Sequence, residues 1–212
     1  MGFFIAWFIV MGGFSIDISH NIKDVKKTLT RLQRKQIPFA AAKALTETAR
    51  DAQRAVTKQI PQKIDRPTRF TMNAIGFNRA NKRTLTSEVF VKPIQNKYLK
   101  YPIDGGVRTV GGTGTGVPTK NKKLNQFGNI PGRKGGLVKG KNQFIATIGS
   151  ISGVWQRFGG KKNPQVKLVV AFEKQVHYKK RLPFYKIAAH TAANQFPKRF
   201  HQSIKLALAT AR

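Results

Sequence analysis

The feature that most constrains this chain is its charge. Among 212 residues, forty lysines and arginines face eight aspartates and glutamates, which gives a formal net charge of +32. Charges of one sign repel each other in a compact body, so they must be offset by salt, by a polyanion or by an acidic protein neighbour. Nucleic acid is the commonest polyanion, and we therefore expect this chain to lie next to DNA or RNA.

The chain nevertheless carries enough apolar residues to fold. Leucine, isoleucine, valine and phenylalanine make up about 27% of the sequence, above the level of about 20% below which charged chains usually stay disordered. A chain of this length accommodates one domain with a proper core, whereas two full domains would be cramped. Cysteine is absent, which excludes a disulfide framework, a thiolate metal site and a cysteine nucleophile.

The first fourteen residues form an apolar extension in this interpretation, and the single folded domain covers residues 15–212. The run GFFIAWFIV (residues 2–10) is too short to span a bilayer, which takes about 20 residues. No lysine or arginine precedes it, as one would in a secretory signal. We interpret residues 1–10 as either an upstream translation-start artefact or a floppy extension, and we predict no membrane role.

Apolar spacing predicts a helical hairpin near the N-terminus. One helix covers residues 21–36, and a second of about 20 residues begins with Pro38 in its first turn and ends at Pro61. Small residues in the second helix allow the first to approach closely. The predicted buried positions are Ile22, Val25, Leu29 and Leu32 in the first helix, and Ala41, Leu45, Ala49, Ala52 and Val56 in the second.

The remaining pattern predicts strands followed by a C-terminal helix. Strand-like runs occupy residues 69–77, 85–93, 142–149 and 165–173. In the second run, Val89 and Val91 point to one side, and Glu88 and Phe90 to the other. The final helical region, residues 182–212, is broken or kinked at Pro197. The predicted class is α+β, with helices on one side of a mainly antiparallel sheet.

One stretch approaches a nucleotide-binding motif. GGLVKGKN (residues 135–142) is one residue away from the phosphate loop G-x-x-x-x-G-K-[ST]. A phosphate loop follows a buried strand and opens a helix, but NIPGRK precedes the glycines and the strand-like QFIATIGSI follows them. Asn142 also replaces the hydroxyl that would bind Mg²⁺. We therefore exclude a nucleotide hydrolase.

No other catalytic constellation is present in the sequence. The four histidines are scattered along the chain. Glu47 and Asp51 are spaced i,i+4, and beside Arg50 and Arg54 they favour intrahelical or intersubunit ion pairs over a two-metal site. We predict that the chain is not an enzyme, with no metal, no cofactor and no small-molecule substrate.

The region between residues 105 and 141 is the candidate binding segment. Glycine, lysine, threonine and proline dominate it, and no carboxylate occurs from Gly105 to Phe172. We interpret it as a long mobile loop or a partly ordered β-ribbon. The candidate contacts to a DNA backbone or to an assembly partner are Lys120, Lys122, Lys123, Arg133, Lys134, Lys139 and Lys141.

Such a cationic segment binds phosphates without reading sequence. Phe127 and Phe144 are the only aromatics nearby, so duplex backbone is favoured over stacking on single strands. A solvated loop, or one that docks on an acidic neighbouring subunit, remains the alternative.

Three parts of the chain resemble a known family. The first is LQRKQIPFAAAKALTETARDAQRAV, the second comprises IDRPTRFTMNAI and LTSEVFVKP, and the third is LPFYKIAAHTAANQFPKRFHQSIKLALATAR. Together they resemble the minor tail proteins of long-tailed phages, the lambda-like minor tail protein Z group. The likeness covers about residues 16–212, it is weakest in the glycine-rich segment, and it carries over no individual functional residue.

The resemblance implies a virion structural protein that completes the tail. Such proteins act at the head-proximal end, where the tail tube meets the head connector and the genome end is held. The implied partners are the tube and tail terminator proteins, the connector, non-specifically bound double-stranded DNA and further copies in a ring, by analogy a hexamer. The implied location is the virion tail, with the host cytoplasm during assembly.

Two further expectations accompany this resemblance. If the helices pack between subunits of a ring, the candidate interface residues are Leu45, Ala49, Ala52, Phe200 and Ile204. The alternative function is a general, sequence-independent nucleic-acid-binding protein, associated with ribosomes or with the nucleoid.

Overall fold

The computed structural model describes residues 6–10, 13–17, 31–112, 114–131, 138, 141–160 and 162–210. The chain divides into two compact units rather than the single domain that we predict from the sequence. The first unit contains Met1–Ile103 and Arg181–Arg212, and the second contains Asp104–Lys180. The predicted start of the basic segment at residue 105 coincides with the boundary between units, but the second unit continues well beyond residue 141.

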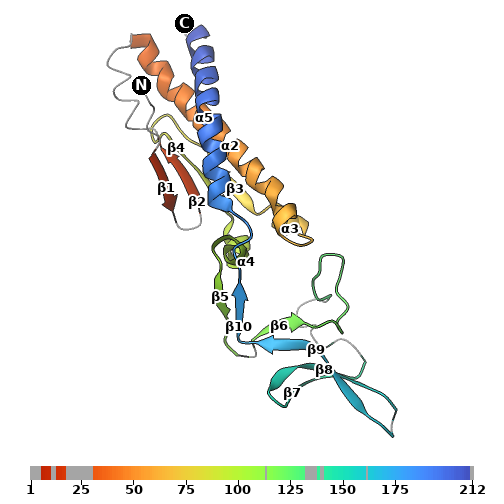
Figure 1. Cartoon of the computed structure of the whole chain (residues 1–212). Helices are drawn as coiled ribbons and strands as arrows, with labels where there is room; N and C mark the ends of the chain where they lie inside the picture. Colours follow the sequence, from red (N-terminus) through yellow and green to blue (C-terminus); the bar gives the residue numbers. More distant parts are fainter. Residues whose placement is uncertain are drawn as a thin grey trace. The chain divides into compact units, whose positions relative to one another are not determined.

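The first unit is built from two long helices and an antiparallel sheet with the strand order β1-β2-β4-β3 (Figure 1). The predicted α+β class is confirmed. The elements of this unit are β1 (Ala6–Val10), β2 (Gly13–Asp17), α2 (Arg31–Lys63), α3 (Arg69–Met72), β3 (Ile75–Asn78), β4 (Thr86–Val91), α4 (Pro93–Asp104) and α5 (Phe184–Ala209).

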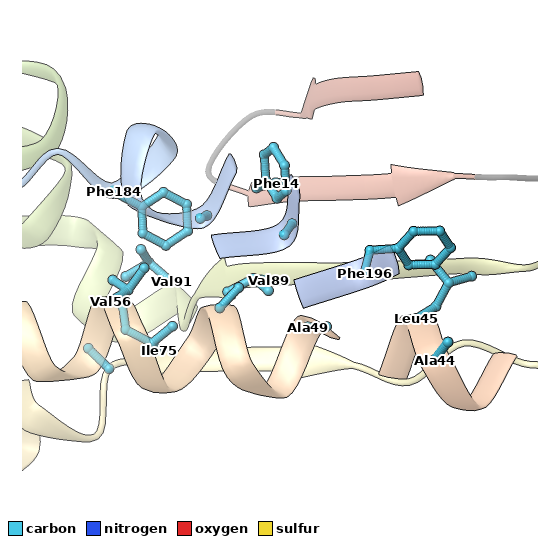
Figure 2. Close-up of a cluster of buried hydrophobic side chains, with 14 of the residues drawn as sticks. Phe14, Ala44, Leu45, Ala49, Val56, Ile75, Val89, Val91, Phe184 and Phe196 are labelled. Carbon is cyan, nitrogen blue, oxygen red and sulfur yellow. The ribbon is translucent and has the colours of Figure 1, made fainter. Parts of the chain in front are cut away.

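The core of the first unit lies where α2, α5 and this sheet meet. Figure 2 shows its buried side chains, which come from α2, α5, β2, β3 and β4. Ala49 and Ala52 of α2 and Ala188 and Ala192 of α5 are all fully buried, and such small side chains let helices approach closely. In β4 the predicted alternation is confirmed, because Val89 and Val91 are buried whereas Glu88 and Phe90 are not.

The predicted N-terminal helical hairpin is wrong, because the structure has no turn between residue 36 and Pro38. Helix α2 runs without interruption through Pro38 and extends past Pro61 to Lys63, and it packs against α5. A proline inside a helix costs about 3 kcal/mol, but Ile37, Ala40 and Ala41 are buried around Pro38, and this packing offsets the cost. Residues 21–30 of the predicted first helix lie outside the described residues. Helix α5 likewise continues through Pro197 and is not broken there.

Two further local predictions are corrected. Residues 69–72 form the short helix α3 rather than a strand, with the Thr68 hydroxyl accepting a hydrogen bond from the backbone N–H of Thr71 at 3.3 Å. Residues 13–17 belong to the folded unit, since β2 pairs with both β1 and β4 and Phe14 is 2% exposed. The predicted domain start at residue 15 is therefore too late.

The second unit contains an antiparallel sheet with the order β6-β9-β8-β7 and a two-stranded ribbon of β5 and β10 (Figure 1). Its strands are β5 (Gly106–Thr109), β6 (Thr115–Pro118), β7 (Gln143–Ile148), β8 (Ile151–Phe158), β9 (Gln165–Glu173) and β10 (Gln175–Tyr178). The predicted strands at 142–149 and 165–173 are confirmed. Val154, Val169 and Val170 form a small core.

The predicted loop at 105–141 is partly ordered, but it is not a ribbon of its own. It contributes β5, which pairs with β10, and β6, which pairs with β9. Both partners lie more than 50 residues further along the chain, so local pattern could not reveal the pairing. No helix within the described residues combines the length and the apolar character that a membrane span requires.

Candidate nucleic-acid interface

A β-bulge organises the segment that follows β6. Between β8 and β9, Val154 pairs with Val170 and Trp155 pairs with Leu168, which leaves Val169 as an extra residue in β9. A bulge of this kind disturbs the ladder and leaves backbone groups in need of other partners. The carbonyl oxygens of Leu168 and Val169 are therefore available to a neighbouring segment.

Thr119 and Asn121 supply the missing donors. The Thr119 hydroxyl lies 2.8 Å from the Leu168 carbonyl oxygen and 3.0 Å from that of Val169, and the Thr119 backbone N–H donates to Val169 at 3.0 Å. The Asn121 amide donates to the Leu168 carbonyl at 2.8 Å. The segment after β6 is thus pinned to the bulge, and Lys120 lies between the two anchoring residues.

A second anchor follows a few residues later. The side-chain oxygen of Asn125 accepts hydrogen bonds from the backbone N–H groups of Phe127 at 3.0 Å and Asn129 at 2.9 Å, which is a turn that asparagine commonly forms. Ile130 then packs against the small core of the sheet. Lys122 and Lys123 lie between these two anchors, so their backbone positions are determined by the fold.

Strand pairing brings further cations to the same end of the sheet. In β9, Lys167 pairs with Gln156, and in β8, Arg157 pairs with Val166. The Arg157 backbone N–H donates to the carbonyl of Asn142 at 3.0 Å, so Lys141 directly precedes the residue bonded to Arg157. We call this set of cations the basic sheet end; it consists of Lys120, Lys122, Lys123, Lys141, Arg157 and Lys167.

The basic sheet end is uncompensated by acids of its own unit. Residues 104–180 hold fifteen lysines and arginines but only two acids, Asp104 and Glu173, for a formal charge of +13. Glu173 pairs with Thr115 at the opposite end of β9. Among the described residues of this unit, Lys120, Lys123, Lys141, Arg157 and Lys167 form no ion pair. The acids of this unit therefore do not neutralise the basic sheet end.

Two aromatic rings support these cations. The Arg157 guanidinium lies 4.6 Å from the centroid of the Phe144 ring, and the Lys167 ammonium lies 5.5 Å from that of Phe158. Such cation–π contacts hold a charged group at a defined position. Because the two rings already carry protein cations, the arrangement favours contacts to phosphate over stacking of unpaired bases.

The structure brings four of the seven predicted contact residues together. Lys120, Lys123 and Lys141 are exposed and Lys122 is half-buried at the basic sheet end. The other three, Arg133, Lys134 and Lys139, lie outside the described residues. Sequence reasoning missed Arg157 and Lys167, because both lie in strands and only the register of those strands places them beside the lysines.

The predicted subunit-interface residues are mostly internal. Leu45, Ala49 and Ala52 are 0% exposed in the core of their own chain, so the prediction that they contact another subunit is wrong. Phe200 is half-buried and stacks on Phe196, with ring centroids 5.5 Å apart. Ile204 is half-buried on α5, and its predicted role stays a prediction.

The acids of α2 also have a different partner from the predicted one. Arg199 of α5 lies 2.9 Å from the Asp51 carboxylate and 3.6 Å from that of Glu47. These ion pairs join the two long helices within one chain, and they are not pairs with Arg50 or Arg54. Elsewhere, Arg66 hydrogen-bonds the neighbouring carboxylate of Asp65 and lowers its pKa.

The described residues offer no arrangement for metal or nucleotide chemistry. Within this part of the chain, no three histidine, aspartate or glutamate side chains gather as metal ligands would. The segment that follows the near-motif at residues 135–142 is strand β7, whereas a phosphate loop requires a helix there. In comparisons with protein-family models, with curated proteins and with solved structures, nothing matches this chain.

Proposed function

We propose that this chain is a non-enzymatic structural protein of a phage tail, which contacts the phosphate backbone of double-stranded DNA through the basic sheet end. The observation that carries the proposal is the convergence of six cations from strands β8 and β9, the turn before β7 and a pinned loop on one end of a sheet. No acid of the unit lies among them, so the surface needs an anionic partner.

The size of the basic sheet end suits a duplex backbone. Adjacent strands lie about 4.8 Å apart, so the four strands of this sheet span roughly 15 Å. A duplex carries one negative charge per about 1.7 Å of its axis, both strands counted, so a duplex segment of this length holds about nine phosphates around its axis. Five of the six cations are lysines, which act as point charges toward phosphate and favour binding without base recognition.

The placement in a tail rests on the resemblance of residues 16–212 to the lambda-like minor tail protein Z group. In this proposal, copies of the chain surround the genome end at the head-proximal end of the tail and contact the tube, the tail terminator and the head connector. A charge of +32 per chain suits a ring whose bore holds DNA, because the phosphates offset the repulsion between copies.

Two measurements test the proposal. Mass spectrometry of purified virions should detect the chain at several copies per particle. Its absence from particles, together with co-sedimentation with ribosomes, would favour a general nucleic-acid-binding protein instead.

The second measurement is complementation of a phage that lacks the gene. We expect the triple variant Lys120→Gln, Lys123→Gln and Lys141→Gln to lower the infectious titre strongly. The matched control is Lys58→Gln, Lys186→Gln and Lys205→Gln, which removes the same charge from exposed positions on α2 and α5. Equal titres from the two variants would contradict the assignment of the basic sheet end.

A further inference from the structure

A groove of about 360 Å³ lies along α2 in the first unit, whereas the basic sheet end belongs to the second unit. Phe39, Lys43, Glu47 and Arg50 recur every three or four residues on α2 and form one wall. Residues 80–82, in the connection between β3 and β4, form the other wall. The volume lies at the lower end of the range typical of binding pockets, about 300–1,000 Å³.

One hydrogen bond joins the two walls, and further hydrogen bonds fix each wall locally. The Thr46 hydroxyl donates to the Ala42 carbonyl at 2.8 Å and accepts from the backbone N–H of Ala80 at 3.1 Å. The side-chain oxygen of Asn81 accepts from the backbone N–H groups of Arg83 and Thr84, both at 2.8 Å. The groove is therefore preformed, which lowers the ordering cost of binding.

The groove offers apolar surface to a ligand. Phe39 is 59% exposed at the groove, and Ala42 and Ala80 line it beside the helix. A single exposed phenylalanine is unremarkable on its own. Next to a preformed groove with small side chains, however, its ring provides one side of a site for a bulky apolar side chain.

The charges at the groove favour an acidic ligand. Lys43, Arg50 and Lys82 line it, and none of them forms an ion pair among the described residues. Glu47 also lines it, but this carboxylate is already paired with Arg199 at 3.6 Å. Three cations around an apolar site complement carboxylates that flank an apolar side chain.

We infer that this groove binds an acidic segment of a partner protein, with a bulky apolar side chain seated beside Phe39 and flanking carboxylates bound by Lys43, Arg50 and Lys82. Nucleic acid fits less well, because its phosphates would contact the three cations but leave the apolar surface of Phe39, Ala42 and Ala80 uncovered. A second copy of the chain is also a poorer match, because its eight acids lie at least four residues apart in the sequence and no bulky apolar residue has a carboxylate within three positions on each side.

The test uses two labelled twelve-residue peptides of equal charge. In one, a central tryptophan is flanked on each side by two glutamates within a glycine-serine frame, and in the other serine replaces the tryptophan. Fluorescence anisotropy should show that the wild-type chain binds the tryptophan peptide at least about tenfold more tightly, the effect expected for burying one large apolar side chain.

Two variants and one matched control test whether the groove is the site that binds the peptide. Phe39→Ser removes the aromatic ring from the groove, and Ala80→Trp fills the groove with a bulky side chain. Each variant should remove the preference for the tryptophan peptide. Phe70→Ser changes a phenylalanine of similar exposure, 52%, that does not line the groove, and it should keep the preference. Circular dichroism confirms that each variant is folded.

Several results would overturn this inference. Equal affinity of the wild-type chain for the two peptides would show that charge alone drives binding. An equal loss of preference in Phe70→Ser and Phe39→Ser would remove the groove from the explanation. The groove would be assigned to nucleic acid if the affinity for duplex DNA falls more in Lys43→Gln/Lys82→Gln than in Lys58→Gln/Lys186→Gln. It would be assigned to a second copy of the chain if the protein dimerises and Phe39→Ser abolishes the dimer.

Discussion

Replacing three exposed lysines of the basic sheet end tests the DNA contact most directly. Glutamine at positions 120, 123 and 141 keeps most of the side-chain length and removes three charges, from +32 to +29. All three side chains are exposed, and none forms an ion pair among the described residues. We therefore expect the fold to be retained, so that a change in binding reports on the contact itself.

The expected magnitude follows from the number of phosphates contacted. Affinity for duplex DNA falls with salt with a log–log slope of about −0.9 per phosphate. Six cations that each contact one phosphate give a slope of about −5.4, and a rise from 50 to 200 mM salt then weakens binding about 2,000-fold. With three cations removed, the slope becomes about −2.7 and the same rise in salt weakens binding only about 40-fold.

The assay is fluorescence anisotropy of a labelled 20-base-pair duplex over a series of salt concentrations. The matched control carries glutamine at Lys58, Lys186 and Lys205 and has the same net charge of +29. We expect its slope to stay within about one phosphate, or 0.9, of the wild-type value. The salt dependence could also become less steep by the same amount in both variants, or stay unchanged in both. Either result would mean that the charge acts as a diffuse field and that the basic sheet end is not the contact.

Three further predictions concern the fold, and urea denaturation measures each. Arg199→Met should lower the free energy of unfolding by about 1–2 kcal/mol, because it leaves two carboxylates of α2 without their cation; Arg199 is 35% exposed, so the loss is smaller than for a fully buried pair. Unchanged stability would show that the pair is energetically neutral. Phe184→Ala should cost about 3–5 kcal/mol, since the ring is 1% exposed in the core, whereas Phe70→Ala should cost less than about 0.5 kcal/mol; similar losses would contradict the burial argument. Thr119→Val should cost about 1 kcal/mol and speed amide exchange at residues 119–123, and unchanged exchange would mean that the bulge does not anchor the loop.

Local pattern predicted some elements well. The strands at 142–149 and 165–173 were predictable because apolar and β-branched residues dominate those runs. The inward side of β4 was predictable because side chains alternate along a strand with a period of two. These features depend only on residues that are adjacent in the sequence.

Helix pairing was not predictable in the same way. Pro38 is a strong local signal for a helix start, and the sequence contains no local sign that α2 packs on α5, about 150 residues later. The structure keeps Pro38 inside α2 because burial of Ile37, Ala40 and Ala41 outweighs the local cost of the proline. The same packing turned Leu45, Ala49 and Ala52 into core residues rather than interface residues.

The sequence by itself determined the strong positive charge from which we predict an anionic partner, because net charge is a sum over residues and does not depend on how the chain folds. It also identified Lys120, Lys122, Lys123 and Lys141 as candidate contacts. Only the tertiary structure decided that they share one end of a sheet with Arg157 and Lys167, since a β-bulge and the strand register bring distant segments together. Register depends on which faces of the strands become buried, and that is a property of the whole unit rather than of any single segment.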